Sequence, residues 1–134
     1  MKYGYLQRGG YVCPQCVARV RSPGVDEGGI AVDAIIDSGA SRTCLPRSLI
    51  RALGDLIQGN PVEVRTCNGS KRVRTFFVDI EVEDVTFPRL EIIELPDERK
   101  HAMVGRDILN HFKLILDGPR EKGGINCRSI CHYQ

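Results

Sequence analysis

One carboxylate in this sequence stands where an enzyme would hold a catalytic acid or base. Asp37 ends the apolar stretch 30–37 and is followed at once by Ser38, Gly39 and Ala40. A strand of this kind delivers its last side chain into largely apolar surroundings, and Gly39 permits a turn that a larger residue would block. Ser38 supplies a hydroxyl that can hydrogen-bond across a tight interface. The alternative is that Asp37 is an ordinary turn residue.

Two such carboxylates side by side could do acid–base chemistry that a single one could not. A single buried carboxylate simply takes up a proton. Two that face each other share one proton, so that one acts as base and the other as acid towards a water and a carbonyl group. Activity would then be highest at acidic to mildly acidic pH, because the pair must hold one proton between two carboxylates.

The elements around Asp37 are predicted to be mostly β, because glycine, proline and β-branched residues punctuate the chain at short intervals. Pro46 is expected to begin a short helix that Gly54 ends, and a second short helix is expected over 106–112, capped by Asp107. Asn68-Gly69 is the strongest turn signal in the chain and predicts a long hairpin over 62–82. Further strands are expected at 17–22, 30–37, 85–95 (with an edge or a bend at Pro88), 113–117 and 124–127.

These motifs together resemble the retropepsin-like aspartic proteases, the family of the retroviral enzymes. The resemblance rests on Asp-Ser-Gly-Ala from Asp37, Leu-Pro and a short helix after it, the Asn-Gly hairpin, and Met-Val-Gly-Arg-Asp-Ile-Leu from Met103. It covers about residues 17–126 of a single domain, 1–134. It implies a single-lobed closed β-barrel or sandwich with a flap hairpin and one or two short helices, active as a homodimer.

The sequence agrees with a homodimer that hydrolyses peptide bonds. It contains one Asp-Ser/Thr-Gly triplet, since Asp117 is followed by Gly-Pro without a hydroxyl residue, and two lobes would not fit comfortably in 134 residues. A second copy would supply the second Asp37 by symmetry. No cofactor is required for this chemistry.

The resemblance also implies roles for individual residues. The catalytic group would be Asp37, Ser38 and Gly39, with the Ser38 hydroxyl bonding across the dimer. Structural support would come from Gly105, Arg106 and Asp107, although Arg106 and Asp107 could instead be a surface charge and a helix cap. Contacts to the peptide would come from Ala40, Arg42, Cys67, Asn68, Gly69, Met103 and Val104.

The sequence departs from the retroviral pattern at Ser41 and Arg42, which stand where an acidic pair is common. The ion-pair partner of Arg106 is therefore not identified by the sequence. Arg42 is expected to shift substrate preference towards acidic side chains.

Six cysteines raise a second question. Cys13 and Cys16 have the spacing of half a tetrahedral zinc site, and Cys127 with Cys131 could complete it if the chain ends meet. The alternative is four reduced thiols. Cys44 is expected to fill the core, and Cys67 to be sensitive to oxidation beside the flap tip.

Composition excludes several classes of function. The net charge of +2 is spread along the chain, which does not favour nucleic-acid binding, and no stretch is long and apolar enough to cross a bilayer. Cysteines without an apolar amino-terminal signal predict a reducing, cytoplasmic compartment. Two rivals to the protease remain: a non-catalytic module that binds peptides or dimerises, and a zinc-stabilised interaction domain in which Asp37 is incidental.

Overall fold

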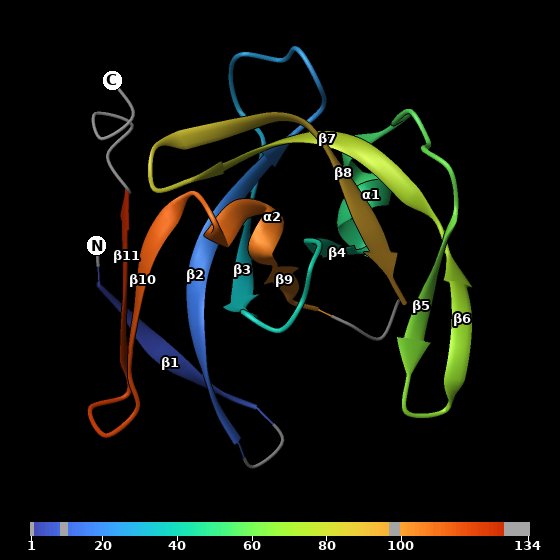
Figure 1. Ribbon diagram of the computed structural model, residues 1–134. Helices are drawn as coiled ribbons and strands as arrows, with labels where there is room; N and C mark the ends of the chain where they lie inside the picture. Colours follow the sequence, from blue (N-terminus) through green and yellow to red (C-terminus); the bar gives the residue numbers. More distant parts are fainter. Residues whose placement is uncertain (1, 9–10, 97–99, 128–134) are drawn as a thin grey trace.

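A mixed β-sheet that closes on itself forms the body of the protein (Figure 1). The computed structural model describes residues 2–8, 11–96 and 100–127. Its elements are β1 (Lys2–Arg8), β2 (Tyr11–Arg21), β3 (Ile30–Ile36), β4 (Cys44–Pro46), α1 (Arg47–Leu53), β5 (Val62–Thr66), β6 (Gly69–Val73), β7 (Thr75–Val82), β8 (Val85–Leu95), β9 (Ala102–Val104), α2 (Arg106–Leu109), β10 (Phe112–Asp117) and β11 (Lys122–Cys127).

Six of the described strands make the barrel, in the order β2-β3-β9-β4-β8-β7, and β7 pairs back with β2. The pairs β3–β9 and β4–β8 are parallel, whereas β2–β3, β4–β9 and β7–β8 are antiparallel. Closure leaves no barrel strand with an unpaired edge. The predicted mostly-β, closed fold is confirmed.

Alternating apolar residues fill the barrel, as β7 illustrates. Phe76, Val78, Ile80 and Val82 are all at most 8% exposed, because side chains two apart point to the same face of a strand. They belong to one buried cluster with side chains of the neighbouring strands. Pro88 lies in a β-bulge of β8, since the register to β7 shifts there, so the predicted bend is confirmed.

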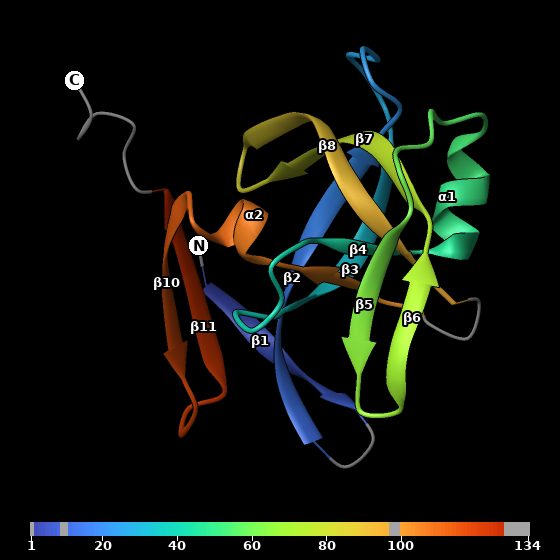
Figure 2. The same ribbon diagram turned by 45° about the vertical axis from the view of Figure 1, so that its right-hand side comes forward.

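The β5–β6 hairpin stands apart from the barrel as a two-stranded sheet (Figure 2). Thr66 pairs with Gly69, so Cys67 and Asn68 form the turn, and Gly69 has the positive φ of 108° that glycine allows. The predicted hairpin over 62–82 is too long. At Arg74 the chain leaves the hairpin, because β7 enters the barrel and pairs with β2 and β8.

The two short helices lie close to where the sequence predicts them. In α1, Leu49 and Ile50 are buried, Pro46 is the N-cap and Gly54 is the C-cap with φ 94°. Helix α2 is shorter than predicted, and its N-cap is Gly105 rather than Asp107. Among residues 2–8, 11–96 and 100–127, no helix combines the length and apolar character that spanning a membrane requires.

The ends of the described chain add a smaller sheet beside the barrel (Figure 1). Strand β1 pairs with β2 on one side and β11 on the other, and β11 pairs with β10. The sequence analysis did not predict β1, and it placed the start of β2 six residues too late, at Val17 instead of Tyr11. On β10, Ile115 and Leu116 are 46% and 47% exposed.

Candidate active site

The loop after β3 carries Asp37 at the point where the strand leaves the sheet. The backbone N–H of Asp37 donates to Val104 O at 3.0 Å, which continues the pairing of β3 with β9. The carboxylate Oδ1 then accepts the N–H of Gly39 at 3.0 Å, and Ala40 N donates to Asp37 O at 3.2 Å. The partly exposed carboxylate is therefore oriented by its own turn.

Gly39 fits this turn because it lacks a side chain. A Cβ at this position would lie 3.2 Å from Asp37 Oδ1, which is a tight contact. Ser38 and Gly39 are exposed, so both remain accessible to another molecule.

The segment from Gly105 to Asp107 is hydrogen-bonded to the loop that follows Asp37. Arg106 N donates to Ala40 O at 2.8 Å, and Asp107 N donates to Ser41 O at 3.2 Å. The guanidinium of Arg106 donates to Ser38 O at 3.0 Å, so it contacts the loop through a carbonyl group and not through a carboxylate. Arg106 therefore has a hydrogen-bond partner in the site loop, where the sequence analysis looked for an ion-pair partner.

Gly105 allows this close approach. A Cβ on Gly105 would lie 2.6 Å from the carbonyl carbon of Arg42 and 2.7 Å from its oxygen. Both are backbone atoms of the site loop, so they could not move aside without moving the loop itself.

Thr43 is a site residue that the sequence analysis missed. Its hydroxyl donates to Asp107 Oδ1 at 2.7 Å and accepts the N–H of Gly105 at 3.2 Å, and its own N–H donates to Asp107 Oδ2 at 2.9 Å. Thr43 is 1% exposed. Its partners lie more than 60 residues away along the chain, so no local pattern points to it. The Asp107 carboxylate thus ties α2 to the end of the site loop.

Arg42 is engaged by a carboxylate that the sequence did not link to it. Its guanidinium lies 3.1 Å from Glu91 Oε1 on β8, and the other Glu91 oxygen accepts the hydroxyl of Thr75 at 2.7 Å. The ion pair offsets the charge on which the expected preference for acidic side chains rested.

A cavity of about 780 Å³ lies between the β5–β6 hairpin and the ends of β4 and β8. Figure 2 shows the hairpin beside the end of β8, and β6 contacts β8. The lining residues are Cys44, Arg47, Val64, Asn68, Ser70, Lys71, Arg72, Val73, Arg74, Ile93, Glu94, Leu95 and Pro96.

Cys44 links this cavity to the Asp37 loop. Cys44 is one of the residues that line the cavity, and it begins β4 directly after Thr43 at the end of the site loop. The pKa of its thiol is raised to about 11, chiefly by burial and further by the Asp107 and Asp37 carboxylates, against an opposing effect of Arg42. The cavity therefore adjoins the strand that leaves the Asp37 loop.

The residues expected to contact a peptide are placed differently from one another. Asn68 lines the cavity, whereas Cys67 at the hairpin turn is exposed to solvent. Met103 is partly buried and pairs with Cys44 across β9 and β4. Val104 is fully buried, so its side chain lies in the core and its carbonyl oxygen contacts the site loop instead.

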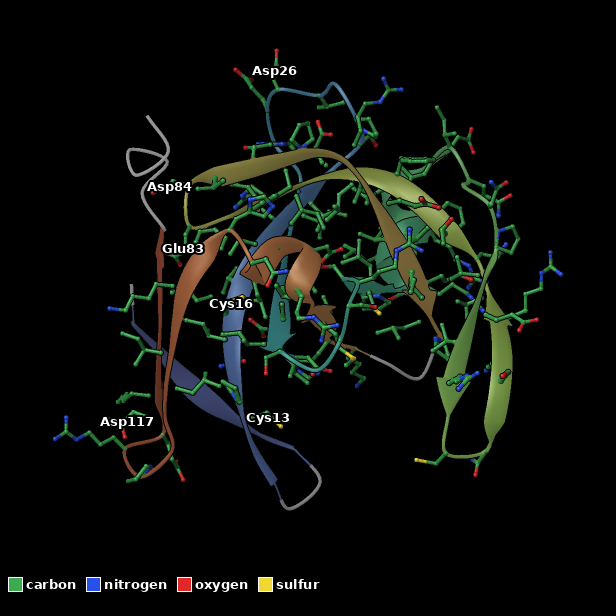
Figure 3. The ribbon with its side chains drawn as sticks, viewed as in Figure 1. Cys13, Cys16, Asp26, Glu83, Asp84 and Asp117 are labelled. Atoms are coloured by element: carbon green, nitrogen blue, oxygen red, sulfur yellow. The ribbon has the colours of Figure 1, made fainter. Side chains whose placement is uncertain are left out.

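Cys13 and Cys16 lie on β2 and do not converge (Figure 3). Three residues apart in a strand, they point to opposite faces. Cys16 is 1% exposed within the core, where burial raises the pKa of its thiol to about 12. Cys131 and the side chain of Cys127 lie outside the described residues, and in the described part no three His, Cys, Asp or Glu side chains cluster to hold a metal. The zinc site stays a prediction.

Comparison with solved structures identifies the same fold elsewhere. A retropepsin-like aspartic protease from Rickettsia conorii matches with a TM-score of 0.68 and 16% identity, over 95% of this chain and 89% of that one. EIAV protease in complex with the inhibitor HBY-793 matches at 0.56 and 15%, over 78% and 92%. Simian foamy virus (mac) protease matches at 0.50 and 18%, over 72% and 91%. No curated protein matches the sequence.

The family comparison covers the site loop, the hairpin and the Gly105 segment. Residues 25–111 match the family described as gag-polyprotein putative aspartyl protease, which is more than half of the chain. The chain therefore belongs to that family, and its fold is that of the retropepsin-like aspartic proteases.

Proposed function

We propose that this protein is an aspartic endopeptidase that acts as a homodimer, with Asp37 of each copy forming the catalytic pair. The observation that carries the proposal is the orientation of the Asp37 carboxylate by Gly39 N–H on a loop of small, exposed residues. Such a loop can approach its symmetry mate closely enough for two carboxylates to share a proton. Family membership supports the same conclusion.

In the proposed reaction, one carboxylate of the pair carries a proton and the other does not. The ionised group takes a proton from a water, whose oxygen attacks the carbonyl carbon of the peptide bond. The protonated group gives its proton to the carbonyl oxygen, so a gem-diol forms. When the C–N bond breaks, one diol hydroxyl returns a proton to the pair and the amine nitrogen receives one, which restores the starting state.

The remaining contacts would keep the pair aligned. Arg106 would hold the Ser38 carbonyl, and the Thr43–Asp107 network would fix the other end of the loop. The β5–β6 hairpin would serve as the flap that closes over an extended peptide and excludes water. Activity should peak at acidic to mildly acidic pH, because the pair must hold one proton.

The outer edge of β10, which pairs with no other strand among the described residues, supports self-association. Within the described residues β10 pairs with β11 alone, and it exposes Ile115 and Leu116. An edge strand with apolar side chains is a template for pairing with another chain.

The test is cleavage of a mixed peptide library by the wild type, Asp37→Asn and Asp33→Asn, over a pH series, with the mass of each measured by light scattering. Asp33 is an exposed carboxylate on the same strand, so it controls for the charge change. We expect a dimer that cuts peptides, with cutting lost only in Asp37→Asn. A folded dimer that binds peptides and cuts none would favour the non-catalytic module, and activity that climbs steadily to pH 9 would contradict the shared proton.

A further inference from the structure

The cavity beside the β5–β6 hairpin carries more positive than negative charge. Its lining contains four basic side chains, Arg47, Lys71, Arg72 and Arg74, and one acidic side chain, Glu94. The rest of the lining is largely apolar, including Val64, Val73, Ile93 and Leu95. A ligand that fits would combine a hydrocarbon stem with a negative charge.

Glu94 is already committed to two arginines. Its carboxylate, with the side chain 4% exposed, accepts two bonds of 2.9 Å from Arg74 and one of 3.3 Å from Arg47. One buried carboxylate is thus shared by two guanidinium groups, whose side chains are 52% exposed at Arg74 and 33% exposed at Arg47. Because the pair with Arg74 is bidentate, the cluster is also held in a fixed geometry.

Lys71 places a positive charge on the hairpin side of the cavity. In the β5–β6 ladder Lys71 stands directly opposite Val64, and residues directly opposite in a ladder share a face. Val64 and Val73 both line the cavity, so this face of the hairpin is turned towards it. Lys71 has no carboxylate partner among the described residues.

A second basic residue of the same hairpin, Arg65, lies on its other face. Arg65 stands opposite Ser70, one residue out of phase with Lys71. Arg65 does not line the cavity. The chain thus offers a matched control: two basic residues on one hairpin, of which one faces the cavity and the other faces away.

We infer that this cavity binds an acidic side chain of the substrate, Asp or Glu, at a position flanking the cleaved bond, and that Lys71 is the residue that recognises it. The inference rests on the proposed function and adds a substrate class to it. The aliphatic stem of the substrate residue would pack on Val64 and Ile93, while its carboxylate meets Lys71 and the Arg74–Arg47 cluster. The Arg42 guanidinium, paired with Glu91, is not needed for this recognition.

The test compares peptides that differ only in Glu against Gln. Library cleavage first locates the flanking position where acidic residues are enriched, and kcat/KM is then measured for the Glu and Gln peptides with the wild type, Lys71→Gln, Lys71→Glu and Arg65→Gln. We expect the wild type to favour the Glu peptide about fivefold, as one partly exposed ion pair allows. Lys71→Gln should remove most of this preference, Lys71→Glu should reverse it, and Arg65→Gln should keep it.

Binding of the same library to the Asp37→Asn chain separates the two proposals. Acidic enrichment that depends on Lys71 in the bound peptides, with no cleavage by the wild type, would support the cavity and overturn the endopeptidase. Cleavage without acidic enrichment, or with a Glu preference that survives Lys71→Gln, would overturn the inference and leave the endopeptidase standing. If peptides are neither cut nor bound, both fail.

Discussion

Thr43→Val tests whether the Thr43–Asp107 network holds the site loop to α2. Valine has nearly the same shape as threonine, so the change removes the hydroxyl with little change in packing. It deletes the 2.7 Å bond to the Asp107 carboxylate and leaves the N–H of Gly105 without its acceptor. A hydrogen bond to a charged group contributes about 1.5–3 kcal/mol, and a buried unsatisfied N–H costs about 1–3 kcal/mol. Because the two effects share one hydroxyl, we expect a loss of about 3 kcal/mol in the free energy of unfolding.

Urea unfolding at one fixed protein concentration measures this loss, since association would make stability depend on concentration. Thr43→Ser keeps the hydroxyl and should lose only about 1 kcal/mol, for its missing methyl group. Thr86→Val, at an exposed position of β8, should change stability by no more than about 0.5 kcal/mol. A Thr43→Val protein as stable as Thr86→Val would refute the network as a brace.

Three further predictions concern the close approach of Gly105 to the site loop and the burial of the cysteine thiols. Gly105→Ala should destabilise the protein by about 2 kcal/mol or more and abolish any cleavage, because the added Cβ would clash with the backbone of the site loop. Gly118→Ala is the control: the space around Gly118 is open, so this variant should be as stable as the wild type in the same urea assay. Alkylation at pH 8, mapped by mass spectrometry, should label the exposed Cys67 well before Cys16 and Cys44, whose pKa values burial raises to about 12 and about 11; equal labelling of all three would contradict it. Above the ordinary thiol pKa of 9.0, the thiols of Cys16 and Cys44 lose their protons in the unfolded chain but keep them in the folded chain, so the free energy of unfolding should fall as the pH rises from 9 towards 12. This fall should be less steep in Cys16→Ala. The same slope in Cys16→Ala as in the wild type would show that Cys16 is not the cause.

Much of the fold could be predicted because its signals are local. The alternation from Phe76 to Val82, the helix after Pro46 with its glycine end, and the bend at Pro88 each depend on neighbours along the chain. The Asp37 turn was recognisable for the same reason, since its Ser-Gly-Ala sequence restricts the backbone there.

The errors arose where partners are distant in sequence. The pair Thr43–Asp107 and the pair Arg42–Glu91 join residues 64 and 49 positions apart, and neither has a spacing that a pattern could reveal. The hairpin was predicted too long because its second arm alternates without a break, whereas pairing with β2 and β8 takes the chain into the barrel at Thr75.

The claim that two copies of the chain share one catalytic pair is tested most directly by mixing wild-type and variant subunits. Wild-type and Asp37→Asn chains are unfolded together, refolded at a constant total concentration and tested for peptide cleavage, with a wild-type and Asp33→Asn mixture as the control. If each active site needs Asp37 from both copies, an equal mixture should retain about one quarter of the wild-type activity, because only that fraction of dimers has two intact chains. Retention of about one half would mean that each chain acts alone, and it would contradict a catalytic pair shared across a dimer.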